Sequence, residues 1–195
     1  MKSKSKRKFL KSIGSAGIFF AGANLPVWAI NISANASTSD QSYELLKPDQ
    51  NNLMLMKGFT SRVVATTGKK SFKGSKYYNY RWHKSPDGGA TFPTSDGGWI
   101  YVSNSERNNG TGGVGALRFN SKAEIVNSYS ICSGTSRNCA GGPTPWGTWL
   151  TCEEYEYGYT WECDPFGVKP PEIIKSLGMF KHEAAAVDPK TSIIY

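Results

Sequence analysis

The sequence predicts an all-β protein. Short runs rich in β-branched and aromatic residues recur along the chain, clusters of Gly, Asn, Pro and Ser separate them, and no long stretch has a helical period. Strands are expected at residues 60–66, 98–103, 114–119, 125–131, 146–152 and 184–187. Many short strands with glycine-rich connections suit a sandwich, a barrel or a propeller, and periodicity alone does not choose among them.

Before these strands, residues 1–36 are expected to be an export signal peptide. Six lysines and arginines precede the first acidic residue, Asp40, an apolar stretch follows at 13–29, and small residues surround Ala34 and Ala36. This order is typical of a signal peptide, although an uncleaved membrane anchor is the alternative. Residues 37–52 are polar and aperiodic, so a flexible linker is expected there.

The leader also explains the charge of the chain. Six of its residues are basic and none is acidic, so the formal net charge of +8 falls to 17 basic against 15 acidic side chains in the remainder. The folded part therefore has no strongly basic surface, and the composition does not support nucleic-acid binding.

Within the leader, the run S-K-R-K-F-L-K at residues 5–11 resembles the twin-arginine export motif, with Lys6 in place of the usual first arginine. The resemblance implies the twin-arginine export machinery as a partner and a periplasmic or secreted location, with no stable membrane span after signal removal. The general secretory route is the alternative. The modest hydrophobicity of residues 14–23 favours twin-arginine export.

The segment C-A-G-G-P-T-P-W-G-T-W-L-T-C-E-E at 139–154 is the most informative part of the chain, because it places one thiol and two adjacent carboxylates around an aromatic strand. Neighbouring residues of a strand point to opposite faces. One of Glu153 and Glu154 can therefore face a central site while the other serves a neighbouring ion or supports the site. Carboxylate oxygens suit hard cations such as calcium and ferric iron.

Three further side chains are candidate metal ligands. Asn104 and Glu106 follow the run W-I-Y-V-S, are separated by one residue and could project on the same side, where an amide beside a carboxylate suits calcium. An exposed turn is the alternative there. Glu183 opens the small-residue run A-A-A-V-D, whereas His182 is expected to be structural and Asp188 to shape a turn.

The cysteines permit two interpretations. Four cysteines make an even set in an exported chain, so a disulfide among Cys132, Cys152 and Cys163 is expected as readily as free thiols. No G-x-x-x-x-G-K-[ST] loop, G-x-S-x-G elbow or H-E-x-x-H helix is present, which excludes phosphate-loop nucleotidases, elbow-type serine hydrolases and zincin proteases. The glycine-rich run at 110–115 is expected to be a hairpin connection.

The 139–154 segment, together with G-F-T-S-R-V-V-A at 58–65, W-H-K-S-P-D-G-G-A-T-F at 82–92, Y-V-S-N-S-E at 101–106 and F-K-H-E-A-A-A-V-D-P at 180–189, resembles the PhoX family of alkaline phosphatases. The resemblance implies a six-bladed β-propeller with calcium and iron in the active site. Residues 53–195 would be its N-terminal blades, truncated at the C-terminus. Cys139 would bind iron, Glu106 and Glu183 would have metal roles, and the arginines that clamp phosphate would lie beyond Tyr195.

The expected function is an exported metal-dependent phosphatase that hydrolyses phosphate monoesters, present as an N-terminal fragment that is inactive in isolation. Small phosphorylated substrates and a monomeric state are expected. Two alternatives remain. The chain could be a non-catalytic, calcium-stabilised propeller that serves as a binding module, since propellers host many functions. It could also be a metal-dependent phosphodiesterase or other esterase.

Overall fold

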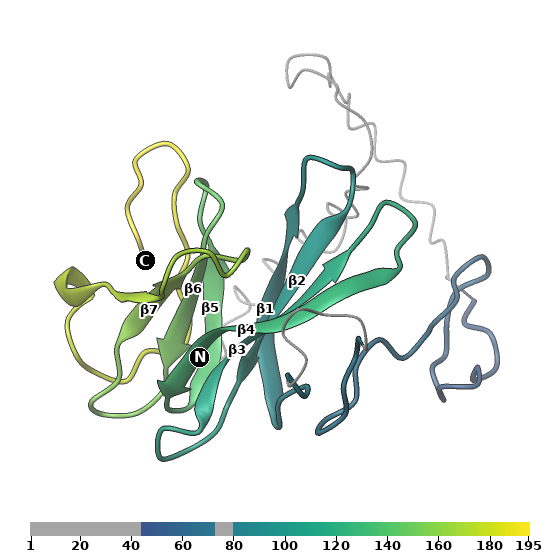
Figure 1. The fold of residues 1–195 in the computed structure, drawn as a ribbon, viewed down its shortest axis with the longest axis horizontal. Helices are drawn as coiled ribbons and strands as arrows, with labels where there is room; N and C mark the ends of the chain where they lie inside the picture. Colours follow the sequence, from purple (N-terminus) through teal and green to yellow (C-terminus); the bar gives the residue numbers. More distant parts are fainter. Residues whose placement is uncertain (1–43, 73–79) are drawn as a thin grey trace, which may run out of the picture. The chain divides into compact units, whose positions relative to one another are not determined.

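The computed structural model describes residues 44–72 and 80–195, which contain two four-stranded antiparallel sheets (Figure 1). The first sheet contains β1 (Pro86–Pro93), β2 (Trp99–Ser105), β3 (Gly112–Phe119) and β4 (Ile125–Thr135). The second contains β5 (Asn138–Pro143), β6 (Trp149–Glu153), β7 (Thr160–Cys163) and β8 (Glu172–Ile173). The described residues contain no α-helix, only the short 3₁₀ helix η2 (Lys175–Leu177), which confirms the all-β prediction.

Each sheet is a meander, in which every strand pairs with the one before it in the sequence. Short turns with local side-chain caps make this possible. Between β1 and β2, the Asp96 carboxylate accepts a hydrogen bond from the backbone N–H of Gly98 at 3.1 Å and pairs with Arg118 of β3 at 2.7 Å. A turn residue thereby fixes the register of three consecutive strands.

The main core is formed by apolar side chains from both sheets. Its buried members are Phe92, Ile100, Val102, Val114, Ala116, Tyr129, Ile131, Cys132, Trp149 and Cys163. Trp149, from β6, is 2% exposed and donates its indole N–H to the Asn104 side chain of β2 at 2.9 Å. The two sheets are therefore held together by buried contacts and not by the connecting chain alone.

The chain passes from the first sheet to the second in two residues, since β4 ends at Thr135 and β5 begins at Asn138. This short connection brings β5 against β1. A Cβ atom at Gly88 would lie 2.7 Å from the Cα atom of Ala140, so only glycine permits the observed approach. The start of β5, which carries the candidate thiol, is thereby fixed beside the ends of the first sheet.

The expected strands agree with the structure in four places. Residues 98–103, 114–119, 125–131 and 146–152 overlap β2, β3, β4 and β6. β6 begins at Trp149 because the Thr144 N–H donates to the Thr148 carbonyl and makes a turn of the preceding residues. β3 begins at Gly112, so the expectation that 110–115 is only a hairpin connection was wrong for most of that run.

Two expected strands do not form. Residues 60–66 have β-branched side chains but no ladder partner, and Val63 is 68% exposed. Residues 184–187 form only the isolated bridge between Val187 and Ile194. Conversely, β1, β5, β7 and β8 were not predicted. β1 and β5 contain Gly and Pro, whose low strand propensity predicts a loop. Both nevertheless form strands, because β1 pairs with β2 and β5 pairs with β6.

The export signal predicted at 1–36 lies outside the described residues. Of the predicted linker at 37–52, only 44–52 are described, and they include a turn in which the Asp49 carboxylate accepts hydrogen bonds from the N–H groups of Asn51 and Leu53. Residues 45–195 form one compact unit. In the described portion of the chain, no helix has the length and apolar character needed to cross a membrane.

Candidate metal centre

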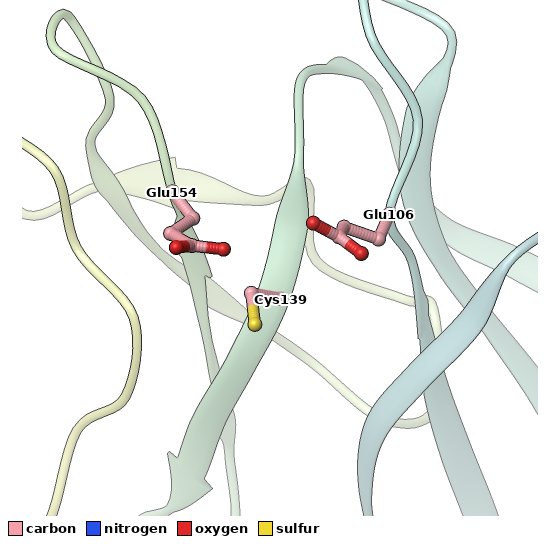
Figure 2. Close-up of side chains that lie close together, drawn as sticks. All are labelled: Glu106, Cys139 and Glu154. Carbon is pink, nitrogen blue, oxygen red and sulfur yellow. The ribbon is translucent and has the colours of Figure 1, made fainter.

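Three of the candidate ligands converge where strands of both sheets begin or end. Glu106 follows β2, Cys139 lies near the start of β5, and Glu154 follows β6. One ligand atom from each lies within 4.8 Å of the other two, and all three residues are half-buried (Figure 2). Residues separated by 48 positions in the sequence thus form one group with a thiol and two carboxylates.

Backbone hydrogen bonds hold the three segments that carry this group. The Arg137 N–H donates to the Arg107 carbonyl at 2.6 Å, and the Glu154 N–H donates to the Arg137 carbonyl at 2.9 Å. Arg137, two residues before Cys139, therefore connects the segment of Glu106 to the segment of Glu154. The spacing of the three side chains follows from these paired segments, so the group is positioned before any ligand binds.

Asn104 supports the backbone of Cys139 and does not join the group. Its side-chain nitrogen donates to the carbonyls of Cys139 and Ala140 at 2.9 and 2.8 Å. Its side-chain oxygen accepts hydrogen bonds from Trp149 and Thr151, both at 2.9 Å. Asn104 is fully buried and its oxygen already has two donors, so the structure gives it a positioning role, and the ligand role expected from the sequence stays a prediction.

Glu153 and Glu154 point to different places, as neighbours on a strand do. Glu153 is 4% exposed, and its carboxylate accepts hydrogen bonds from the N–H groups of Ser136 (2.7 Å) and Tyr159 (3.1 Å) and from the Trp161 indole (3.0 Å). Glu154 instead lies with Cys139 and Glu106. Of the two predicted ligands, Glu154 lies at the site, while Glu153 joins the segments around it.

Glu183 lies beside the site by its backbone. Its carbonyl accepts a hydrogen bond from the Ala140 N–H at 3.0 Å, but its side chain is exposed and is not part of the group of three. Its metal role stays a prediction. The preceding residue, His182, is 7% exposed, contacts the Gly178 carbonyl through Nε2 at 3.3 Å and packs on the Phe180 ring, in line with the structural role expected for it.

Asp87 was not among the ligands predicted from the sequence, yet it lies close to the site. Its carboxylate is 4.0 Å from the Cys139 sulfur, and it belongs to β1. The signal that could have indicated it is the run S-P-D-G-G, because Gly88 permits the approach of β1 to β5 that brings Asp87 to Cys139. Local sequence does not reveal such a contact between strands distant in the sequence.

The electrostatics of the site are dominated by its acidic groups. Burial, followed by the carboxylates of Asp87, Glu154 and Glu106, raises the pKa of the Cys139 thiol to about 11. The pKa of Glu154 is lowered, chiefly by its hydrogen bond with Lys181, whose Nζ lies 2.9 Å from the carboxylate. Cys139 is therefore protonated at neutral pH until a cation compensates the surrounding negative charge.

The three side chains offer both hard oxygen donors and a softer sulfur donor to a metal ion. Carboxylate oxygens suit hard cations such as calcium and ferric iron, and a thiolate adds the softer donor found at iron and zinc sites. Three side chains are fewer than the six to eight oxygens that calcium usually binds. Glu106, Cys139 and Glu154 thus supply part of a coordination sphere.

Comparison with known families assigns a class to this segment. Residues 97–156 match the family model described as alkaline phosphatase PhoX, which confirms the resemblance for the part of the chain from β2 through β6. The matched part contains Glu106, Cys139 and Glu154, so the geometric group and the family match coincide. No curated protein and no solved structure matches the chain. The motifs at 58–65, 82–92 and 180–189 lie outside the matched segment.

Proposed function

We propose that this chain forms part of an exported, metal-dependent phosphatase that hydrolyses phosphate monoesters. The observation that carries the proposal is the convergence of Glu106, Cys139 and Glu154 inside the segment that matches the alkaline phosphatase PhoX family. These residues come from both sheets, and their backbone is fixed by Arg137 and Asn104, as a site that must hold a metal in one geometry requires.

The metals that we propose, calcium and iron, are those that the family resemblance implies. When bound, such ions polarise a phosphoryl oxygen and compensate the charge that develops in the transition state. The residues of this chain supply two carboxylates and one thiol to hold them, and Asp87 adds negative charge beside the thiol. By the family resemblance, Cys139 would be the residue that binds iron.

Basic side chains at the rim suit an anionic substrate. Lys181 pairs with Glu154 at 2.9 Å, and the charge of Arg137 contributes to the lowered pKa of Glu154. Arg107 borders a polar cavity of about 490 Å³ that Glu106 also lines, together with Ser85, Asn108, Asn109 and Thr111. We propose that this cavity admits the substrate and that Arg107 contacts phosphoryl oxygens, for which a guanidinium is well suited.

We also propose that the two sheets are the first blades of a six-bladed propeller. Each sheet is a four-stranded antiparallel meander in sequence order, which is the form of a propeller blade. The sheets follow each other through a two-residue connection and share a buried core, as neighbouring blades do. In a propeller, ligands from several blades meet at one central site, which agrees with the origin of Glu106 in one sheet and of Cys139 in the next.

Export through the twin-arginine route is proposed from the leader at residues 1–36. A fusion of residues 1–39 to a reporter that is active only after folded export tests it. We expect export in cells with a working twin-arginine system and retention when Arg7→Lys removes the remaining arginine. Retention of the unchanged fusion would contradict this route.

The metal assignment is tested on the purified chain. After incubation with calcium and ferric iron and removal of excess ions, the metal content should decrease in Cys139→Ser, Glu106→Gln and Glu154→Gln. Glu156→Gln is the matched control, because Glu156 is an exposed carboxylate two residues from Glu154. Equal metal content in all five proteins would overturn the site.

Hydrolysis of an aryl phosphate tests the reaction. Because the isolated chain is expected to be inactive, the assay uses the full-length protein of which this chain is proposed to form part. Turnover that is lost there with Cys139→Ser supports a phosphatase, and a bis-aryl phosphate assayed in parallel separates a monoesterase from a phosphodiesterase. Metal binding without hydrolysis by the full-length protein favours the second candidate, a calcium-stabilised binding module, which the position of the acidic group between two sheets also suits.

A further inference from the structure

Two of the three cysteines outside the candidate metal centre meet in the main core. Cys132 is in β4 of the first sheet and Cys163 is in β7 of the second, and they are 4% and 0% exposed. Both belong to the same cluster of buried side chains, where each thiol is close enough to the other to shift its pKa. Cys152 lies apart, in a separate cluster with Leu150 and Ala185, and contacts Thr160.

The contact between these two strands is held by neighbouring groups. The Tyr129 hydroxyl of β4 donates to the Pro165 carbonyl, two residues after Cys163, at 2.8 Å in a buried position. Gly167 packs in the same place, since a Cβ there would lie 3.2 Å from the Tyr129 ring. β4 and the turn after β7 are therefore fixed against each other beside Cys132 and Cys163, in the core cluster that contains both cysteines.

We propose that Cys132 and Cys163 form a disulfide that joins the two sheets, and that Cys139 and Cys152 remain thiols. The bond would connect β4 to β7, in the same two sheets between which the ligands of the candidate metal centre are divided. The proposal does not depend on the phosphatase function, because it rests only on the packing of the core.

The chemistry is thiol–disulfide exchange with an external disulfide. The Cys132 thiolate attacks one sulfur of the external disulfide and displaces one thiolate, which forms a mixed disulfide. Deprotonated Cys163 then attacks the Cys132 sulfur and displaces the second thiolate. Two protons and two electrons leave the protein, and the external disulfide is reduced to two thiols.

The structure favours this order of attack. Cys132 lines two cavities, of about 450 and about 170 Å³, and Cys163 lines neither. The hydrogen bonds from Cys163 and Thr135 lower the pKa of Cys132, whereas the Cys132 sulfur and burial raise the pKa of Cys163. The more accessible thiol is thus also the one that ionises first, which is the arrangement required of the attacking sulfur.

The bond requires no polar group to be left alone in the core. Each of the two thiols has the other as its main partner, and Cys132 also has Thr135, so oxidation removes a weak donor and its acceptor together. The closed loop would run from 132 to 163, and a loop of about 30 residues is long enough for the bond to restrict the unfolded chain substantially.

The experiment uses the full chain, purified in the reduced state, then exposed to oxidised glutathione while folded and alkylated after denaturation. Cleavage after Lys, Arg and Glu places the cysteines in three peptides. Cys132 lies in the peptide 125–137, Cys139 and Cys152 lie in the peptide 138–153, and Cys163 is the first residue of the peptide that starts at 163. We expect a linked peptide that joins 125–137 to the one starting at 163, and alkylated Cys139 and Cys152.

Thermal unfolding provides the second measurement. Oxidation should raise the Tm of the unchanged chain by roughly 10 °C. Oxidation should raise the Tm of the Cys152→Ala control equally. It should not change the Tm of Cys132→Ala or of Cys163→Ala. A link through Cys139 or Cys152, or no link in the folded chain, would overturn the proposal. The peptide map decides even if a core variant does not fold, because it is made on the unchanged chain.

Discussion

The side-chain amide of Asn104 donates to the backbone carbonyl of Cys139 at 2.9 Å, so a fully buried residue of the first sheet fixes the backbone of the candidate thiol ligand in the second. The same amide donates to Ala140 and accepts from Trp149 and Thr151. All four of its hydrogen bonds are made to the second sheet. Asn104 thus couples the packing of the two sheets to the geometry of the candidate metal centre.

Asn104→Ala is expected to lower the free energy of unfolding by about 2–4 kcal/mol, because it leaves two carbonyls, an indole N–H and a hydroxyl without their buried partner. Metal binding should weaken with it, since the Cys139 backbone loses its support. Urea unfolding and metal content measure the two effects. Asn108→Ala, at an exposed asparagine, is the control and should change the unfolding midpoint little. Equal stability of both variants would contradict the role of Asn104.

The adjacent pair Glu153 and Glu154 should separate stability from metal binding. Glu153→Gln replaces a carboxylate oxygen by an amide beside N–H donors and should cost about 2–3 kcal/mol of stability, because it breaks buried, charge-assisted hydrogen bonds. Glu154→Gln should leave the urea midpoint nearly unchanged and reduce metal content. If both variants lose metal equally at unchanged stability, the different orientations of the two side chains are wrong.

The sequence predicted the all-β class and the central strands because their residues are rich in β-branched and aromatic side chains, as in β2 and β4. It did not predict β1 and β5. Their Gly and Pro residues lower the strand propensity, yet β1 pairs with β2, β5 pairs with β6, and Gly88 permits β1 to lie close to Ala140 of β5. Local propensity cannot include a partner that is distant along the chain.

The candidate site was also predicted only in part from the sequence. Cys139 and Glu154 are carried by one motif, and Glu106 follows a recognisable strand, so residue type and strand ends were enough to select them. The sequence could not show that Glu153 would be enclosed by N–H donors or that Asp87 would approach the thiol. The first depends on how β7 and the β4–β5 connection pack around Glu153, and the second depends on how β5 lies against β1.

The folded chain is expected to lose stability in mild acid because His83 is held in its neutral form. Its ring contacts the Tyr80 hydroxyl at 2.9 Å and packs on Trp82, and burial lowers its pKa from 6.5 to about 4. Between these two values the unfolded chain binds a proton that the folded chain does not. Stability is therefore complete above pH 6.5 and falls as the pH decreases toward 4, by about 3 kcal/mol over the full window.

Urea unfolding at pH 7 and pH 5 measures this dependence. The decrease should be smaller in His83→Gln, which has no proton to bind, while His182→Gln should retain it because His83 is intact. The comparison of variants removes the contribution of carboxylates, which titrate in all three proteins. An equal decrease in His83→Gln and in the unchanged chain would show that another group is responsible.

Lys181 is expected to oppose cation binding. Its ammonium lies 2.9 Å from a Glu154 carboxylate oxygen, so it competes for an oxygen that a metal ion would use, and it adds positive charge beside the site. Lys181→Ala should strengthen calcium binding severalfold at low salt, and the gain should diminish as ionic strength rises. Stability should change little, because Lys181 is 59% exposed and surface ion pairs contribute little.

Calorimetric titration with calcium measures the affinity, with Lys122→Ala, at an exposed lysine of the β3–β4 turn, as the control. Weaker calcium binding in Lys181→Ala would mean that the lysine orders Glu154 for the metal instead of competing with it.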